Sequence, residues 1–194
     1  EGLAELWNSV SIYLFRDSVL AVYQAVVTDQ EIRKQRGIAA SQTLKAHIAS
    51  PEVVIDEANQ QIVMFFHGQR DSLSQVSGVA LSTNGLDFIP SEKKLGAVYL
   101  RSFAYKDQHY FLAAPGILYR SDELLGDYEP RSKSLFGNDT RHSAVLLQDD
   151  QLTVVWSRVG DAPERLLVST VSLSSSDWDD WVPTHPTELL RAEQ

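Results

Sequence analysis

From residue 51 onward, short apolar runs rich in Val, Ile, Tyr and Phe alternate with turn-forming residues. Residues 52–68 read as EVVID, then EANQ, then QIVMFFHG, which is a strand, turn, strand pattern. The next run, VSGVALS at 76–82, precedes an Asn-Gly pair that favours a tight hairpin turn. YLRSFAYKDQHYFLAAP, with KDQ as its turn, and the outer pair GILYRSDELLGDYEP repeat the theme. The pattern therefore predicts a series of antiparallel hairpins.

A third unit follows the same order, with HSAVLLQDDQLTVVWSRVG turning at QDD and ERLLVSTVSL after it. The three units begin near residues 50, 97 and 141, a spacing of about 45 residues that is typical of four-stranded propeller blades. We therefore predict an all-β fold, a partial β-propeller of about three blades, with blades at 47–92, 93–136 and 137–185. The DWDDW segment (177–181) is predicted to belong to an outer strand.

Residues 1–46 have a different character and are predicted to form a helical appendage. Asp17 is a suitable N-cap, Ala and Gln favour a helix, and Gly37 would end it. The alternative is a strand, because the valines of this segment suit a strand as well; they are Val19, Val22, Val26 and Val27.

The amino-acid composition limits the classes of ligand and macromolecule that this chain is expected to bind. The chain has 194 residues, a formal net charge of −9 and no cysteine. Disulfides and thiolate metal sites are thereby excluded. The negative charge argues against nucleic acid and anionic membrane surfaces, which require clustered Lys and Arg. The apolar stretch at 18–27 is about half the length of a membrane span. We expect a cytoplasmic protein with no cofactor and no membrane or nucleic-acid partner.

Three motifs carry a resemblance to a known family: HIASPEV (47–53), RHSAVLL (141–147) and VGDAPER (159–165). Over roughly residues 46–191 the chain resembles bacterial proteins of unassigned function related to the five-bladed β-propeller glycoside hydrolases of families 43 and 32. The resemblance implies a partial copy that lacks complete first and last blades. An open propeller exposes apolar sheet faces, at a cost of about 25 cal/mol per Å². We therefore expect a homodimer in which residues 1–46 help to cover the open edge.

The same resemblance implies a catalytic role for Glu52. In such glycosidases one carboxylate activates water or attacks the anomeric carbon, and a second protonates the leaving oxygen. A further acid, which tunes the proton donor in family 43, lies in a Trp-Ala-Pro-Asp segment, and Glu52 in SPEV matches its position with Glu in place of Asp. The alternative is a strand-entry carboxylate that accepts a hydrogen bond from a backbone amide.

Other candidates lie at strand starts. Arg101 and the pair Arg141-His142 take the place in the second and third blades that Glu52 takes in the first, so all are predicted to face one axis. His142 could act as an acid, a base or a donor to a sugar hydroxyl. The two arginines are predicted to bind substrate.

His47 and His67 bracket the first blade and are predicted to bind substrate near the mouth of the channel. With Glu52 they could instead form a zinc site, although histidines at strand ends usually make ordinary hydrogen bonds, and we expect no metal.

The charged loop SRVGDAPER (157–165) supplies two further candidates. Arg158 follows a strand directly and is predicted to bind substrate, and Glu164 is a second candidate acid. Alternatively, Glu164 simply pairs with Arg165. The tryptophans could stack on sugars, but packing within blades is the commoner role of this residue; they are Trp156, Trp178 and Trp181.

These features predict a carbohydrate-processing or carbohydrate-binding protein. The alternative is a catalytically silent, truncated propeller that serves as a binding or self-assembly module.

Overall fold

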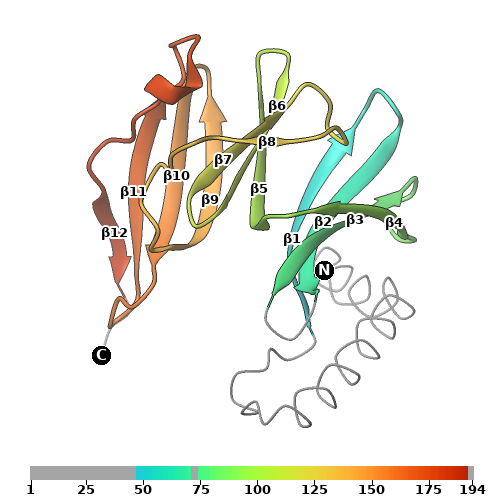
Figure 1. Cartoon of the computed structure of the whole chain (residues 1–194), viewed down its shortest axis with the longest axis horizontal. Coiled ribbons are helices and arrows are strands. Elements are labelled where there is room, and N and C mark those ends of the chain that lie inside the picture. Colours follow the sequence, from blue (N-terminus) through green and yellow to red (C-terminus); the bar gives the residue numbers. More distant parts are fainter. Residues whose placement is uncertain (1–46, 71–73, 192–194) are drawn as a thin grey trace, which may run out of the picture. The chain divides into compact units, whose positions relative to one another are not determined.

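The computed structural model describes residues 47–70 and 74–191. In this part of the chain the fold is all-β, as expected, and it contains three four-stranded antiparallel sheets (Figure 1). The residues form two compact units: unit 1 ends at Val98 and unit 2 begins at Tyr99. The helix predicted over 17–37 lies outside the described residues.

Unit 1 contains one sheet in sequential order. Its first hairpin turns at EANQ, as predicted, because the Asp56 carboxylate accepts hydrogen bonds from the Asn59 main-chain NH at 3.2 Å and from Gln61 Nε2 at 2.9 Å. Gln60 closes the turn in the left-handed region, with a φ of 51°. The strands are β1 (Ile48–Asp56), β2 (Gln61–Gln69), β3 (Gln75–Ser82) and β4 (Ile89–Leu95).

The prediction of a tight hairpin at the Asn-Gly pair is wrong. β3 ends at Ser82 and β4 begins at Ile89, so a longer loop joins them. The side chain of Asn84 shapes this loop, because its Oδ1 atom accepts hydrogen bonds from the main-chain NH groups of Leu86 and Asp87, both at 2.9 Å. An Asn side chain that binds its own loop favours this wider turn over the two-residue one.

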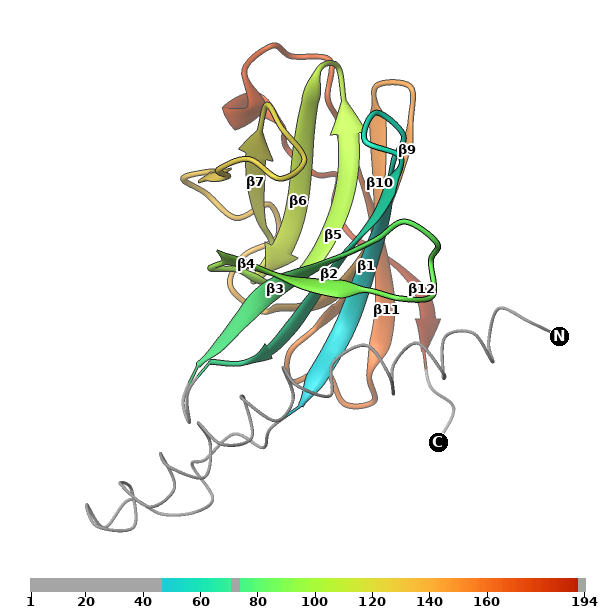
Figure 2. The ribbon, with the colours of Figure 1, turned by 90° about the vertical axis from the view of Figure 1, so that its right-hand side faces the viewer.

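Unit 2 contains two sheets, each in sequential strand order. Figure 2 shows β5, β6 and β7 running side by side. The strands of the first sheet are β5 (Val98–Tyr105), β6 (Gln108–Ala114), β7 (Ile117–Ser121) and β8 (Glu129–Pro130). Those of the second are β9 (Thr140–Gln148), β10 (Gln151–Arg158), β11 (Arg165–Ser172) and β12 (Thr187–Arg191).

The DWDDW segment was predicted to be part of an outer strand, and this is wrong. It forms a short 3-10 helix at Trp178–Asp180, which Asp177 caps by accepting a hydrogen bond from the Asp179 main-chain NH. Trp181 is 2% exposed and donates from Nε1 to the carbonyl oxygen of Ser175. The capping Asp177 at one end and the buried Trp181 at the other favour this turn. The outer strand is β12, beyond the predicted blade end at residue 185.

The first strand of each sheet has an irregular start. In β1 the register shifts between Ala49 and Glu52, and Ser50 has a φ of 52°. In β5 Tyr99 has a φ of 58°. In β9 the register shifts just before Ser143. Such irregularities redirect side chains at the end of a strand, and they lie where the sequence repeat placed the site candidates.

The core of unit 2 is formed by facing side chains of its two sheets. Trp156 and Leu112 are almost fully enclosed there, and Phe136 stacks on Trp156 with ring centroids 4.8 Å apart. The buried members of this core are Phe103, Tyr105, Tyr110, Leu112, Leu118, Leu135, Leu152, Val154, Trp156, Leu167, Val171, Leu173 and Trp181.

Candidate functional site

Polar side chains gather at the starts of β5 and β9 in unit 2, and we call this group the first-strand cluster. The rings of Tyr99 and His142 meet edge to face, with centroids 4.9 Å apart. Arg141 Nη1 lies 3.5 Å from Glu164 Oε1, and both side chains are about half exposed. The cluster consists of Tyr99, Arg101, Arg141, His142 and Glu164. Four of these five residues were predicted as site residues; Tyr99 was missed.

Arg101 is held in place by main-chain oxygens. Its Nε atom donates to the carbonyl oxygen of Ser143 at 2.9 Å, and its Nη1 atom donates to the carbonyl oxygen of Leu100 at 2.6 Å. A guanidinium group fixed in this way is a preorganised donor, and it also carries its positive charge close to His142.

His142 is held in its neutral form. Partial burial lowers the pKa of its imidazole, and the positive charges of Arg141 and Arg101 lower it further, while Glu164 opposes them. At neutral pH the ring therefore offers one hydrogen-bond donor and one acceptor.

The sheet register corrects the predicted equivalence between blades. In β1 the first residue paired after the irregularity is Glu52, opposite Phe65. In β9 it is Ser143, opposite Trp156. Ser143, rather than His142, therefore matches Glu52. The same irregularity occurs in both strands, with two residues opposite one, so Ala49 matches Thr140 and the sequence repeat was aligned one residue too early in the third blade.

Arg158 is engaged elsewhere in unit 2. Its Nε atom lies 2.9 Å from Asp139 Oδ2, and its guanidinium carbon lies 5.3 Å from the centroid of the Trp156 ring. Arg158 therefore links the end of β10 to the segment before β9. Neither of these contacts involves a residue of the first-strand cluster.

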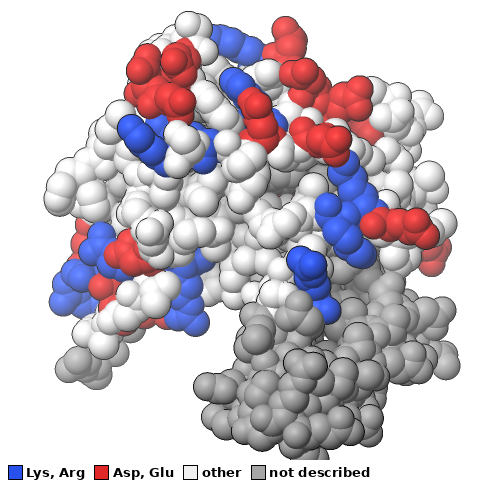
Figure 3. Space-filling model, viewed as in Figure 1, with Lys and Arg blue, Asp and Glu red and all other residues white. Residues whose placement is uncertain are grey.

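The alternative pairing of Glu164 with Arg165 is wrong. Arg165 binds Asp161 at 2.9 Å and Glu188 at 3.5 Å, whereas Glu164 contacts Arg141. The Arg165 guanidinium lowers the pKa of Asp161. Figure 3 shows the resulting mixture of basic and acidic side chains beside β12.

In unit 1 the remaining candidates are His47, just before β1, Glu52 within β1 and His67 near the end of β2. His47 Nε2 lies 2.7 Å from Gln75 Nε2, and its ring meets that of His67 edge to face at 5.6 Å. His67 is 1% exposed, so its ring is not presented to solvent, whereas Glu52 is half-buried. Within 47–70 and 74–191, no three histidine or acidic side chains are grouped to hold a metal ion, so the zinc interpretation is not supported.

The tryptophans serve mainly in packing. Trp156 and Trp181 are each 2% exposed and belong to the core of unit 2. Trp178 is half-buried, and the guanidinium carbon of Arg120 lies 4.2 Å from its ring centroid. Among the described residues, these three tryptophans therefore show no contact with the first-strand cluster.

Sequence reasoning missed a cavity of about 470 Å³ formed by β6, β7, β8 and the loop between β7 and β8. Acidic side chains gather over this loop in Figure 3. The signal was present in YRSDELLGDYEP, where the acidic residues are too dense for an ordinary edge strand. The cavity is lined by Gln108, Arg120, Ser121, Asp122, Glu123, Gly126, Asp127 and Glu129.

The fold is similar to that of several glycoside hydrolases. An exo-β-1,3-galactanase from Clostridium thermocellum superposes with a TM-score of 0.57 at 14% identity, over 74% of this chain and 36% of that enzyme. An endo-1,4-β-xylanase from Bacteroides thetaiotaomicron gives a TM-score of 0.57 at 14% identity, over 78% and 63%. A family 117 glycoside hydrolase from Zobellia galactanivorans gives 0.51 at 7% identity, over 75% and 57%. These likenesses establish a propeller-like fold.

Sequence comparison adds a viral relative. An uncharacterised protein of Acanthamoeba polyphaga mimivirus is 29% identical over 161 residues, which cover 74% of this chain. The chain spans about 45% of the length of that relative. No protein-family model matches the sequence. The described part of the chain contains no helix with the length and apolar character of a membrane span.

Proposed function

We propose that this chain is a carbohydrate-binding module built from three blades of a propeller of the glycoside-hydrolase type, and that the first-strand cluster of unit 2 is its binding site. The observation that carries the proposal is the placement of Arg101, Arg141, His142 and Tyr99 at the starts of β5 and β9. The fold shared with the galactanase and xylanase structures supports a polysaccharide as the ligand.

The chemistry of the cluster suits sugar hydroxyl groups. Two guanidinium groups donate hydrogen bonds, a neutral imidazole both donates and accepts, and Glu164 accepts. Arg101 is already fixed by two main-chain oxygens, so little side-chain entropy is lost when it binds a ligand. Arg141 and Glu164 are about half exposed and meet solvent directly.

Binding is favoured over hydrolysis because the cluster contains one carboxylate, that of Glu164. Glycoside hydrolysis requires two carboxyl groups about 5–9.5 Å apart across the scissile bond. Glu52 belongs to unit 1 and is not a member of this cluster.

Affinity electrophoresis tests the proposal. The purified chain is run through native gels that contain β-1,3-galactan or β-1,4-xylan, and its mobility is compared with that in gels without polysaccharide. We expect retardation by at least one polymer and its loss in Arg141→Ala. Arg191→Ala is the matched control, because Arg191 is also about half exposed and paired with a glutamate. Equal retardation of both variants, or none of the wild type, would overturn the proposal.

An exposed apolar face favours a second function, self-association. On the second sheet of unit 2, Leu146, Leu166 and Leu190 are 57%, 38% and 62% exposed. The register places the three leucines on one face of the sheet. Leu146 pairs with Thr153, and Thr153 pairs with Thr170. Leu166 lies four positions before Thr170 on the same strand, so it shares that face, and it pairs with Leu190. We propose that a second copy of the chain covers this face, which would make the protein a homodimer.

A further inference from the structure

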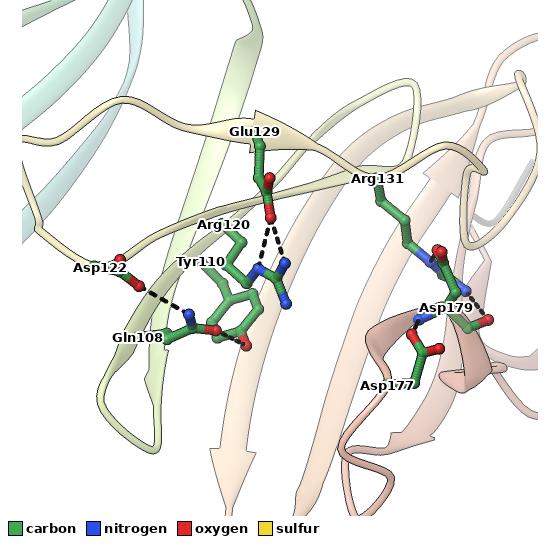
Figure 4. Close-up of polar contacts among 8 residues, drawn as sticks. All are labelled: Gln108, Tyr110, Arg120, Asp122, Glu129, Arg131, Asp177 and Asp179. Atoms are coloured by element: carbon green, nitrogen blue, oxygen red, sulfur yellow. Dashed lines mark hydrogen bonds and ion pairs between the residues drawn. The ribbon is translucent and has the colours of Figure 1, made fainter.

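The cavity formed by β6, β7 and β8 contains a guanidinium group held by several partners. Arg120 donates from Nε to Glu129 Oε1 at 3.0 Å, and its Nη2 atom contacts the same oxygen (Figure 4). The guanidinium also lies over the ring of Trp178, 4.2 Å from its centroid. A side chain restrained in this way is a preorganised hydrogen-bond donor rather than a mobile surface arginine.

A short chain of hydrogen bonds fixes a second polar side chain of the cavity, that of Gln108. Tyr110 donates from its hydroxyl to Gln108 Oε1 at 3.0 Å, and Gln108 Nε2 donates to Asp122 Oδ1 at 2.9 Å (Figure 4). Burial raises the pKa of Tyr110, so its hydroxyl keeps its proton and the direction of the chain is set. The amide of Gln108 is therefore oriented, with its second N–H available.

The same cavity also contains carboxylate oxygens that can still accept hydrogen bonds. Both bonds from Arg120 go to one oxygen of Glu129, and the bond from Gln108 goes to one oxygen of Asp122. Within residues 47–70 and 74–191, the second oxygen of each carboxylate and the whole carboxylate of Glu123 accept no hydrogen bond. The cavity therefore combines fixed donors with free acceptors.

This combination selects a chemical class of ligand. A carboxylate or phosphate would be repelled by the four lining carboxylates, which outnumber the one lining arginine. An ammonium group only donates, so it would face the positive charge of Arg120 and leave the donors of Arg120 and Gln108 unmatched. A hydroxyl group both donates and accepts, and neighbouring hydroxyls can use an arginine and a carboxylate together.

We propose that this cavity is a second carbohydrate subsite, distinct from the first-strand cluster, which takes a neutral sugar residue through vicinal hydroxyl groups. Its volume of about 470 Å³ lies within the range of about 300–1,000 Å³ typical of small-ligand sites. The subsite rests on the proposed carbohydrate function for its ligand class, but its residues are separate from those of the cluster.

NMR titration of the full chain tests the subsite. Methyl β-galactoside and methyl β-xyloside are added to 15N-labelled protein, and amide shifts are followed at residues 108, 120–129 and 141–143. We expect saturable shifts at 108 and 120–129 with at least one of the two sugars. Gln108→Ala and Glu123→Ala should each weaken this binding about fivefold, the equivalent of about 1 kcal/mol for a lost hydrogen bond. Glu57→Ala is the matched control, because Glu57 is also exposed and its side chain accepts no hydrogen bond among the described residues.

The outcomes separate the two sites. Shifts at 108 and 120–129 that weaken in the cavity variants and persist in Arg141→Ala support the subsite, even if the cluster binds nothing. Shifts confined to 141–143 overturn the subsite and leave the proposed function standing. Stronger shifts at 120–129 with methylamine than with either sugar overturn it as well, because the cavity would then be a cation site.

Discussion

Arg101 on β5 donates a hydrogen bond from Nε to the carbonyl oxygen of Ser143 on β9, over 2.9 Å. The two residues are 42 positions apart in the sequence, and their contact joins the first strands of the two sheets of unit 2. Ser143 is the residue at which β9 resumes regular pairing after its irregular start. The contact therefore positions the first-strand cluster and links the two sheets.

Replacing Arg101 with Ala should destabilise the protein. The variant loses hydrogen bonds from a charged donor to two carbonyl oxygens, and we expect the free energy of unfolding to fall by about 1–3 kcal/mol. Urea denaturation measures the loss. Lys133→Ala, at an exposed site, is the control and should change stability by less than about 0.5 kcal/mol. Equal stability of the two variants would show that the Arg101 contact does not hold the sheets together.

Gly116 is required by the turn between β6 and β7. Its φ is +89°, and an added Cβ would lie 2.8 Å from Ser134 Oγ and 3.0 Å from Thr140 Oγ1. Gly160→Ala is an informative control, because Gly160 has a φ of +87° but nothing within 4 Å of its added Cβ. Both variants should suffer backbone strain of about 1–3 kcal/mol. Thermal unfolding should show a clearly larger loss for Gly116→Ala, and equal losses would refute the crowding.

The pKa of His142 makes stability depend on pH. The imidazole, flanked by Tyr99 and Arg101 from β5 and by Arg141 and Glu164, has a lowered pKa in the folded protein. The unfolded state therefore binds a proton first as the pH falls below about 6.5. The contribution of His142 to the free energy of unfolding is therefore complete above that pH, and it is lost as the pH falls toward the pKa of His142 in the folded protein.

The variant His142→Gln should flatten this part of the curve of unfolding free energy against pH, measured between pH 7.5 and 5. His185→Gln is the control, since His185 is exposed and its contact is to the adjacent Pro186. An unchanged slope in His142→Gln would mean that another group titrates there.

The apolar face of the second sheet predicts a concentration-dependent homodimer. Leu146→Lys places a charge in the proposed interface and removes a side chain whose burial contributes about 1.5–3 kcal/mol per copy, so dimer dissociation should become at least tenfold easier. Analytical ultracentrifugation at several concentrations measures it. Val182→Lys is the control, because Val182 is also an exposed apolar residue but is not one of the three leucines, and this variant should leave the dimer intact. A wild-type monomer at every concentration would rule out the interface.

The sequence pattern predicted the strands well because half-buried strands leave a strong alternation of apolar and polar residues. EVVID, QIVMFFHG and HSAVLLQ all lie in strands, and EANQ forms the turn that its polar residues indicate. The irregular strand starts were not predictable, since a bulge has no composition of its own. This is why Ser143 and Tyr99 were missed.

Two elements differ from their predicted positions, and local contacts explain both differences. Asn84 binds the main chain of its own loop, so the hairpin at Asn-Gly is wider than expected. Asp177 caps a 3-10 turn, which moves the outer strand to Thr187–Arg191. The cavity was missed because it depends on how Arg120 and Gln108 meet acidic residues across strands, and such contacts between separate strands are absent from a linear pattern.

Isothermal titration of the full chain with β-1,3-galactan and β-1,4-xylan oligosaccharides tests the central claim most directly. Wild-type protein should release or absorb saturable heat with at least one of them, without release of reducing ends, and Arg141→Ala should bind that oligosaccharide at least about fivefold more weakly. Absence of binding to both oligosaccharides, or an affinity unchanged in Arg141→Ala, would contradict carbohydrate binding at the first-strand cluster.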